Sequence, residues 1–124
     1  MPNICLNSRD ELLLIDIEKI AFLQANGNYT RLTYIGGQSM MLTMGLSKVE
    51  DMLRAAHPKN RPGLYVRLGR SLIINQAYLS SISMCKQKVV LSDRGHNSYS
   101  LSVPKELLKV YKNKISDTFA SMNK

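Results

Sequence analysis

Two arginines stand three residues apart in residues 65–75, which read YVRLGRSLIIN. The guanidinium groups of Arg67 and Arg70 are suited to forked hydrogen bonds with phosphates and with the edge of guanine. Gly69 and Ser71 complete a short turn between apolar segments, and strands on both sides would hold that turn rigidly. The spacing therefore predicts a basic turn that either contacts a nucleic acid or simply lies in water.

Two more turns carry groups of the same kind. Residues 26–31 (NGNYTR) place the side chains of Asn28, Thr30 and Arg31 beside a flexible glycine. After the last predicted strand, Lys105 lies in the first turn of a helix, where free N–H groups can hold a phosphate. Each turn alone is weak evidence because turns are usually polar. Three such turns together favour a nucleic-acid partner.

The basic residues are concentrated in the second half of the chain. Residues 1–51 carry four basic and six acidic side chains, whereas residues 52–116 carry twelve basic side chains and two acidic ones. This imbalance indicates a polyanionic partner, and we add Lys86 and Lys88 to the candidate nucleic-acid contacts. A solubilising surface is the alternative interpretation. A membrane partner is disfavoured because no predicted helix combines a basic face with bulky aromatic anchors.

Length and composition predict a single domain spanning residues 1–124. The chain has 124 residues, of which 44% are hydrophobic, and this suffices for a modest core. No apolar segment is long enough to cross a membrane and no signal peptide opens the chain, so we expect a cytoplasmic protein. Cys5 and Cys85 lie in apolar, strand-like contexts and are expected to be buried reduced thiols.

The sequence gives little support for catalysis, a cofactor or a metal. No serine lies in a G-x-S-x-G elbow, and the glycine patterns of phosphate and dinucleotide loops are absent. His57 and His96 are expected in solvated loops, and two cysteines without a nearby histidine do not make the usual zinc site. We therefore expect a protein that is not an enzyme and that needs no cofactor.

Hydrophobic alternation and turn signals predict a mainly β chain with antiparallel strands. Strands are expected at residues 12–15, 20–25, 30–35, 39–43, 64–68, 72–74, 79–84, 88–92 and 98–103. The strongest turn signals between them are Asn26-Gly27-Asn28, Gly36-Gly37 and Asp93-Arg94-Gly95. Loops this short favour antiparallel neighbours.

Two helices are expected among the strands. Ser47 and Glu50 have the spacing of a capping box, and the apolar stripe around them ends before His57-Pro58. That stripe consists of Leu46, Val49, Leu53 and Ala56. The second helix opens at Pro104, a residue suited to a first turn. Its expected buried face consists of Leu107, Leu108, Tyr111, Ile115 and Phe119.

Two polar residues near the strands have a structural interpretation beside the functional one. Asn75 ends its predicted strand, and we expect its amide to satisfy backbone groups there. Arg67 alternates with apolar neighbours, so it could be paired on a face of the sheet instead of contacting a nucleic acid.

In these motifs the chain resembles the LytTR-type DNA-binding domains, the output modules of many bacterial response regulators. The resemblance covers roughly residues 4–115 and is strongest in residues 16–30 (DIEKIAFLQANGNYT) and 66–75 (VRLGRSLIIN). Leu46 with its helix and the strand pair around residues 88–91 add to it. It implies antiparallel β architecture with a C-terminal helix, in which loops rather than a recognition helix enter successive major grooves.

The resemblance also implies roles for single residues. Thr30 and Arg31 match the first reading loop, and Arg70 and Ser71 match the second. Arg67 is implied as a neighbour or support of the second loop.

Two positions depart from the family pattern. Gly69 stands where the family often has a histidine, and Pro104 stands where many members have a base-reading arginine. Either Lys105 substitutes for that arginine or the third loop reads less sequence.

The resulting expectation is a bacterial transcription regulator that binds double-stranded DNA sequence-specifically. Relatives commonly recognise direct repeats in promoters, so we expect two copies on one site. The chain shows no receiver domain, which leaves its signalling partner unidentified. Two alternatives stay open: a protein-interaction domain that docks an acidic signalling partner, and an RNA-binding module.

Overall fold

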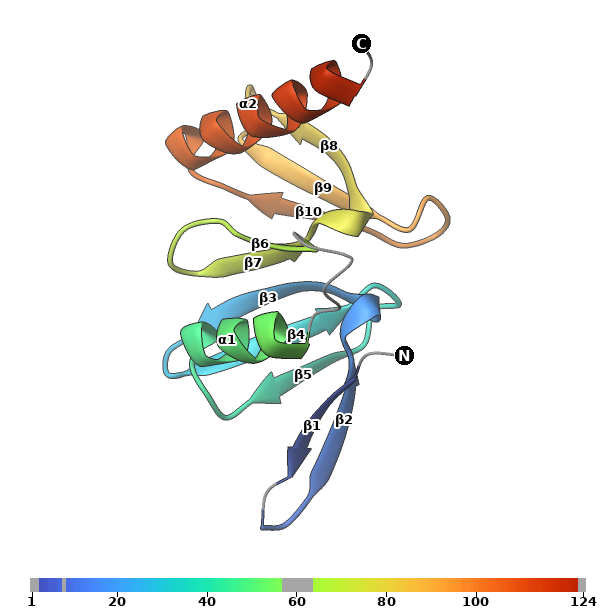
Figure 1. The fold of residues 1–124 in the computed structure, drawn as a ribbon, viewed down its shortest axis with the longest axis vertical. Coiled ribbons are helices and arrows are strands. Elements are labelled where there is room, and N and C mark those ends of the chain that lie inside the picture. Colours follow the sequence, from blue (N-terminus) through green and yellow to red (C-terminus); the bar gives the residue numbers. More distant parts are fainter. Residues whose placement is uncertain (1–2, 8, 57–63, 123–124) are drawn as a thin grey trace. The chain divides into compact units, whose positions relative to one another are not determined.

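The computed structural model describes residues 3–7, 9–56 and 64–122 and is mainly β (Figure 1). The strands are β1 (Asn3–Asn7), β2 (Leu12–Asp16), β3 (Ile20–Asn26), β4 (Tyr29–Tyr34), β5 (Ser39–Leu42), β6 (Tyr65–Arg67), β7 (Leu72–Asn75), β8 (Leu79–Ser83), β9 (Lys88–Ser92) and β10 (Ser98–Ser102). The helices are α1 (Leu46–Ala56) and α2 (Lys105–Met122), with short 3-10 turns at Ile17–Lys19 and Gln76–Tyr78. The predicted helix stop at His57-Pro58 lies outside the described residues.

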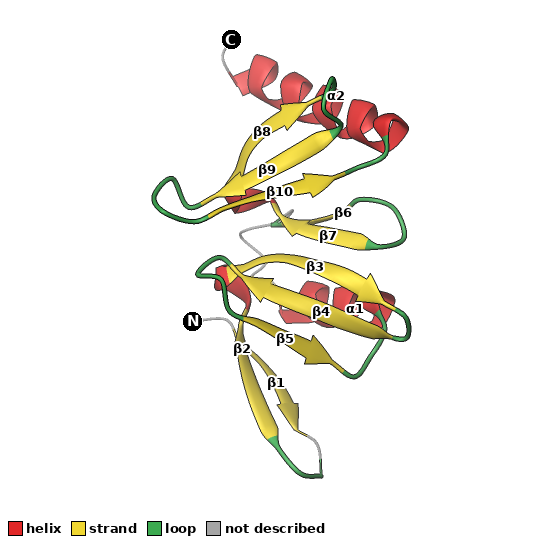
Figure 2. Ribbon diagram, turned by 180° about the vertical axis from the view of Figure 1, so that it is seen from behind, coloured by secondary structure: helices red, strands yellow, loops and turns green. Residues whose placement is uncertain are grey.

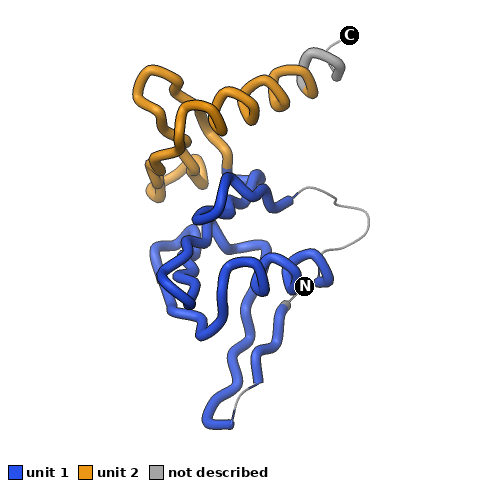
Figure 3. The backbone as a smooth tube through the Cα atoms, turned by 90° about the vertical axis from the view of Figure 1, so that its left-hand side faces the viewer, with its two compact units in different colours: residues 1–78 blue, residues 79–124 orange. Residues whose placement is uncertain are grey.

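The chain divides into two compact units, residues 1–78 and residues 79–124, which Figure 3 colours separately. Every strand pair that the structure describes is antiparallel, as the short loops predict. The predicted strands are confirmed, and no end of a strand differs from its predicted position by more than one residue.

A five-stranded sheet in the order β5-β4-β3-β7-β6 forms the body of the first unit. The central strand β3 pairs with β4, which follows it directly, and with β7, which lies far along the chain. Gly27 and Gly37 have φ values of 61° and 103°, so both predicted glycine turns use the left-handed region that suits glycine. The β3–β7 pair joins two hairpins into one sheet.

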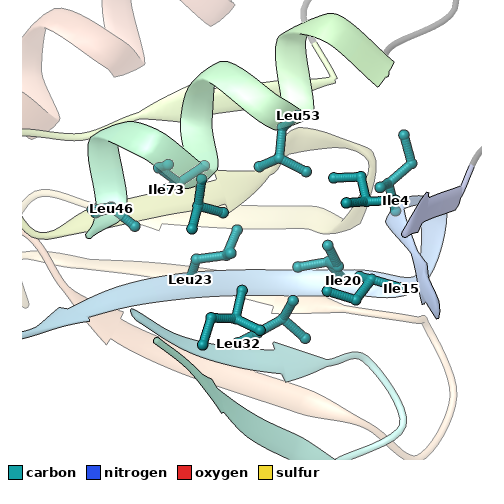
Figure 4. Packing of buried hydrophobic residues seen from close by; sticks show 11 residues of the cluster. Ile4, Ile15, Ile20, Leu23, Leu32, Leu46, Leu53 and Ile73 are labelled. Carbon is teal, nitrogen blue, oxygen red and sulfur yellow. The ribbon is translucent and has the colours of Figure 1, made fainter. Parts of the chain in front are cut away.

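Helix α1 covers one face of this sheet (Figures 1 and 2). Leu46, Val49 and Leu53 are buried at helical spacing, which confirms the predicted stripe. They pack against Leu23, Leu32 and Ile73 of the sheet (Figure 4). The remaining buried members of this core are Ile4, Ile15, Ile17, Ile20 and Leu42.

The start of α1 differs from the prediction. The helix begins at Leu46, and the carbonyl of Gly45 accepts a hydrogen bond of 3.1 Å from the Val49 N–H. Ser47 therefore lies inside the first turn and is not the N-cap residue, so the capping-box interpretation is wrong. The side chains of Ser47 and Glu50 contact Arg67 instead.

Strands β1 and β2 form a separate hairpin, of which only β2 was expected. Ile4 and Ile15 face each other across this pair and are buried, whereas Cys5 faces Leu14 on the other side. Leu14 is 63% exposed and Cys5 is also exposed. Cys85 is exposed as well, so the prediction of buried cysteines is wrong for both thiols.

The second unit combines a three-stranded sheet in the order β10-β9-β8 with α2. Its buried apolar residues include Val89, Leu91, Leu101, Val103, Leu108 and Tyr111. Burial raises the pKa of the Tyr111 hydroxyl to about 12. Leu107 is 38% exposed, so its predicted place on the buried face is wrong, and the side chain of Phe119 lies outside the described residues.

Candidate nucleic-acid interface

The first candidate loop comprises residues 26–31, where β3 turns into β4. Asn28 and Arg31 are exposed, and Arg31 stands opposite Gln24 on β3 and Met41 on β5. Side chains alternate between the faces of a strand, so Arg31 points away from the face that carries the buried Thr30 and Leu32. This loop therefore presents an amide and a guanidinium group to solvent.

Thr30 lies on the inner side of the same loop. It is 0% exposed, and its hydroxyl donates a hydrogen bond of 2.9 Å to the carbonyl of Met44, in the segment that leads into α1. The side chain thus links the start of β4 to the chain just before the helix. It holds the first loop in place from within.

The second candidate loop comprises residues 67–71, where β6 turns into β7. The Leu68 N–H donates to the Leu72 carbonyl at 2.8 Å and closes the hairpin. Gly69 has a φ of 81°, which a three-residue hairpin loop commonly requires of one residue. Arg70 and Ser71 are exposed on this closed turn.

The two loops lie at the same edge of the sheet. Gln24 pairs with Leu72 in the β3–β7 ladder, so the end of β3 lies beside the start of β7. One step further, the Ala25 N–H donates a hydrogen bond of 2.9 Å to the Ser71 carbonyl. Backbone contacts thus join the second loop directly to the strand that leads into the first.

Arg67 is extensively paired. Its Nη1 group lies 2.8 Å from Oε1 of Glu50 and 3.4 Å from the hydroxyl of Ser47. Its Nε group donates to the Gly69 carbonyl at 2.9 Å, and Nη2 donates to the Arg70 carbonyl at 3.0 Å. Arg67 therefore connects α1 with the backbone of its own loop, as the structural interpretation of this residue predicts.

The second unit gathers its candidate lysines at one end of its sheet. Lys88 begins β9 and stands opposite Ser102, the last residue of β10. The Val103 N–H donates to the Gln87 carbonyl at 3.0 Å, which joins the β8–β9 turn to the start of α2. Lys86 lies in that turn and Lys105 begins the helix, and both are exposed.

The nine candidate residues thus fall into three sets. Exposed side chains belong to Asn28, Arg31, Arg70, Ser71, Lys86 and Lys105. Lys88 is half-buried. Thr30 is buried and Arg67 is held in an ion pair, so both side chains support the loops and do not form their exposed surface.

Three groups that support the loops were not identified as such from the sequence: the carbonyl of Met44 and the side chains of Ser47 and Glu50. Ser47 and Glu50 were noticed only for their helical spacing. The spacing of two residues along a helix does not show which distant residue they face.

Other kinds of site find no support in the described part of the chain. Residues 3–7, 9–56 and 64–122 contain no group of three His, Cys, Asp or Glu side chains placed to hold a metal ion. Among the same residues, neither helix has the length and apolar character needed to span a membrane.

Comparisons with known proteins identify a family and a similar fold. A family model described as the LytTr DNA-binding domain matches residues 10–116, which extend over both units. One solved structure, the LytTr DNA-binding domain of a Bacillus cereus protein named as a candidate methyl-accepting/DNA response regulator, has a similar fold. Its TM-score is 0.60 at 18% identity, with 91% of this chain and 95% of that chain covered. No curated protein matches the chain. This family is non-enzymatic, and membership in it implies DNA binding in transcription regulation. Because the family model covers most of the sequence, the chain belongs to the family of LytTr DNA-binding domains.

Proposed function

We propose that this chain is a bacterial transcription regulator that reads double-stranded DNA by inserting its two adjacent loops into the major groove. The observation that carries the proposal is the hydrogen bond of 2.9 Å between the Ala25 N–H and the Ser71 carbonyl. It fixes the spacing of the loops through backbone groups, which change little when side chains move. The major groove, about 12 Å wide, admits a two-stranded β ribbon such as the tip of either hairpin.

Four exposed side chains supply the proposed DNA contacts of the first unit. Arg31 and Arg70 carry guanidinium groups, which can bind a guanine edge through two hydrogen bonds or a phosphate in a similar way. Asn28 can pair with adenine through its amide, and the Ser71 hydroxyl suits either a base or a phosphate. Each pairing is carried by a group that faces solvent.

Lysines of the second unit supply proposed phosphate contacts. Lys86, Lys88 and Lys105 belong to one end of the three-stranded sheet, where the β8–β9 turn meets the start of α2. Lysine acts as a point charge and is suited to phosphates rather than to base recognition. Lys105 follows Pro104, which cannot contact a base through a polar side chain. We therefore assign this end of the three-stranded sheet to contacts with the phosphate backbone of DNA.

The proposed operator is a direct repeat, with one copy of the chain on each half. Selection of bound sequences from a random pool of DNA duplexes tests this directly, because a reading domain enriches one motif and a repeat of it. In parallel, the association constant is measured against salt concentration. Neutralisation of about five phosphates predicts a slope of log K against log salt of roughly −4 to −5.

Two outcomes would count against the proposal. A pool that stays random, together with binding that ignores salt, would contradict both the base contacts and the phosphate contacts. Preference for structured RNA over duplex DNA would support the RNA-binding alternative instead. Absence of DNA retardation, together with co-purification of an acidic partner, would support the protein-interaction alternative.

A further inference from the structure

Arg67 lies between the second loop and α1, and most of its hydrogen-bonding capacity is already used. A guanidinium group has five N–H donors in a fixed fork. Four acceptors surround this one: Glu50 Oε1, the Ser47 hydroxyl and the carbonyls of Gly69 and Arg70. We call these groups together the Arg67 network. At most one donor is left, so Arg67 has no pair of N–H groups for a forked contact with DNA.

The ion pair in the centre of the network is partly sheltered from water, whereas the bonds to Ser47 and to the Arg70 carbonyl are exposed. The side chains of Arg67 and Glu50 are 24% and 18% exposed. Glu50 is also held by Arg54, whose Nη2 lies 2.9 Å from Oε2 in an i,i+4 pair on the helix surface. Because Arg54 is 76% exposed, its pair adds little, whereas the sheltered Arg67 pair is screened less.

The network determines how the second loop is presented. Arg67 binds the carbonyls of both Gly69 and Arg70, the two residues just before Ser71. Fixing two consecutive carbonyls fixes the peptide planes on both sides of the Arg70 Cα atom, and with them the direction in which the Arg70 side chain leaves the backbone.

The same segment of chain also supports the first loop. Met44 accepts the hydrogen bond of the buried Thr30 hydroxyl, and Ser47 and Glu50 contact Arg67. Residues 44–50 are therefore a common support for two loops that lie far apart in sequence.

We infer that Arg67 is a positioning residue, which Glu50 holds in place so that the Arg70 side chain meets DNA in a fixed direction. This inference rests on the proposed function of the loops. It gives Glu50, an acidic residue, a supporting role in sequence-specific binding to a polyanion.

Neutralising Glu50 separates positioning from simple electrostatics because the two predict opposite signs. Glu50→Gln removes one negative charge, so a protein attracted only by its net charge would bind DNA more tightly. If Glu50 holds Arg67, the same change weakens binding to the selected sequence roughly tenfold, because the neutral amide of glutamine holds the guanidinium group less firmly than a carboxylate does. Binding to random duplex stays equal or becomes tighter.

Asp51→Asn is the matched control. Asp51 is the next residue of α1, is exposed, and loses the same charge in a change of the same size. We expect equal or slightly tighter binding of both the selected and the random duplex. If Glu50→Gln behaves like Asp51→Asn on both duplexes, the positioning role is overturned.

Arg67→Lys provides a second test that keeps the charge. A lysine cannot bridge four separate acceptors, so we expect lower affinity for the selected sequence with an unchanged salt slope. If Arg67 bound a phosphate itself, Arg67→Ala would reduce the magnitude of the slope by about one. That reduction would overturn the inference.

A measurement without DNA separates failure of this inference from failure of the proposed function. In the free protein, the Nε–H proton of Arg67 should give a slowly exchanging NMR signal that disappears or shifts in Glu50→Gln and is unaffected by Asp51→Asn. Fast exchange in the unmodified protein would overturn the network whatever the DNA results are. Absence of DNA binding with this signal intact would overturn only the proposed function.

Discussion

Tyr65 and Asn75 stand opposite each other in the β6–β7 pair, yet their polar groups differ in how well they are satisfied. The Asn75 amide is 0% exposed and donates to the Ile20 carbonyl at 2.8 Å, while its oxygen accepts from the Ala77 N–H at 2.9 Å. The Tyr65 hydroxyl is also buried but has no hydrogen-bond partner among the described residues. The two positions should therefore respond in opposite ways to loss of the polar group.

Asn75→Ala should lower the free energy of unfolding by about 2–4 kcal/mol, because it removes the partner of the buried Ile20 carbonyl and that of the part-buried Ala77 N–H and empties a fully buried position. Chemical denaturation, monitored by circular dichroism, measures the change. The control is Asn28→Ala, at an exposed position, for which we expect a change within about 0.5 kcal/mol. Equal changes in the two variants would contradict the structural role of Asn75.

Tyr65→Phe should leave the free energy of unfolding unchanged or raise it by up to about 1 kcal/mol, because it removes a buried hydroxyl without a partner in the described structure. The ring, which supplies the packing, is retained. Burial is also the main reason why the pKa of the Tyr65 hydroxyl is raised. A loss of more than about 1 kcal/mol in the same denaturation experiment would mean that the hydroxyl has a stabilising partner.

Gly27→Ala should destabilise the protein by about 1 kcal/mol, because Gly27 has a φ of 61°, where a side chain is strained. Gly36→Ala is a closely matched control, since a Cβ atom at either position meets no atom within 4 Å and only Gly27 has a positive φ. We expect Gly36→Ala to be close to neutral. Similar losses for both variants would show that the backbone conformation is not the cause.

The turn between β9 and β10 should make the free energy of unfolding depend on pH. Asn97 and the Gly95 N–H donate hydrogen bonds to Asp93, and these bonds lower the pKa of its carboxyl from the ordinary value of 3.8. The ionised form is thus favoured by folding. The ionised carboxylate therefore stabilises the folded protein above pH 3.8. This stabilisation is lost as the pH falls through the lowered pKa that Asp93 has in the folded protein.

Asp93→Asn should accordingly be less stable than the unmodified protein at neutral pH, and the difference should shrink at a pH well below 3.8. Thermal unfolding across this range measures the difference. Asp51→Asn, on the surface of α1, serves as the reference for loss of a carboxylate. A difference that is constant with pH would contradict the role of the ionised form.

Arg70→Ala should weaken binding to the selected duplex by about 1–3 kcal/mol and binding to random duplex by much less, because a forked contact with guanine discriminates among bases. Competition assays with both duplexes provide the measurement. Lys112→Ala, on the exposed surface of α2, is the control for a lost positive charge. An equal loss on both duplexes would make Arg70 a phosphate contact.

Local chemistry was enough to predict most of the strands and the turns between them. Asn26-Gly27-Asn28 and Gly36-Gly37 form hairpin turns because glycine tolerates positive φ, and this tolerance follows from the residue type alone. Asn75 satisfies backbone groups as predicted, since a buried amide at a strand end has few other uses.

The predictions that failed depend on distant neighbours. Ser47 and Glu50 had the spacing of a capping box, but Arg67 approaches them from a strand about twenty residues away. Cys5 looked buried from its apolar surroundings, yet it lies on the outer side of the β1–β2 hairpin. Which side of a strand faces the core depends on what packs against it, and local sequence does not contain that information.

The adjacency of the two loops also depends on distant neighbours. It depends on the pairing of Gln24 with Leu72, which brings together segments almost fifty residues apart. The types of the candidate side chains can be read from the sequence, whereas their common edge follows from the sheet.

The division between inner and outer residues of the loops bears on how such a domain acquires new operators. Thr30 and Arg67 hold the loops from within, while Asn28, Arg31, Arg70 and Ser71 lie outside the buried core. If these four side chains contact DNA as proposed, substitutions there should change the preferred sequence with little effect on folding. Duplicated copies of the gene can therefore diverge in target while the scaffold stays unchanged, and a laboratory library limited to these four codons is a direct route to altered specificity.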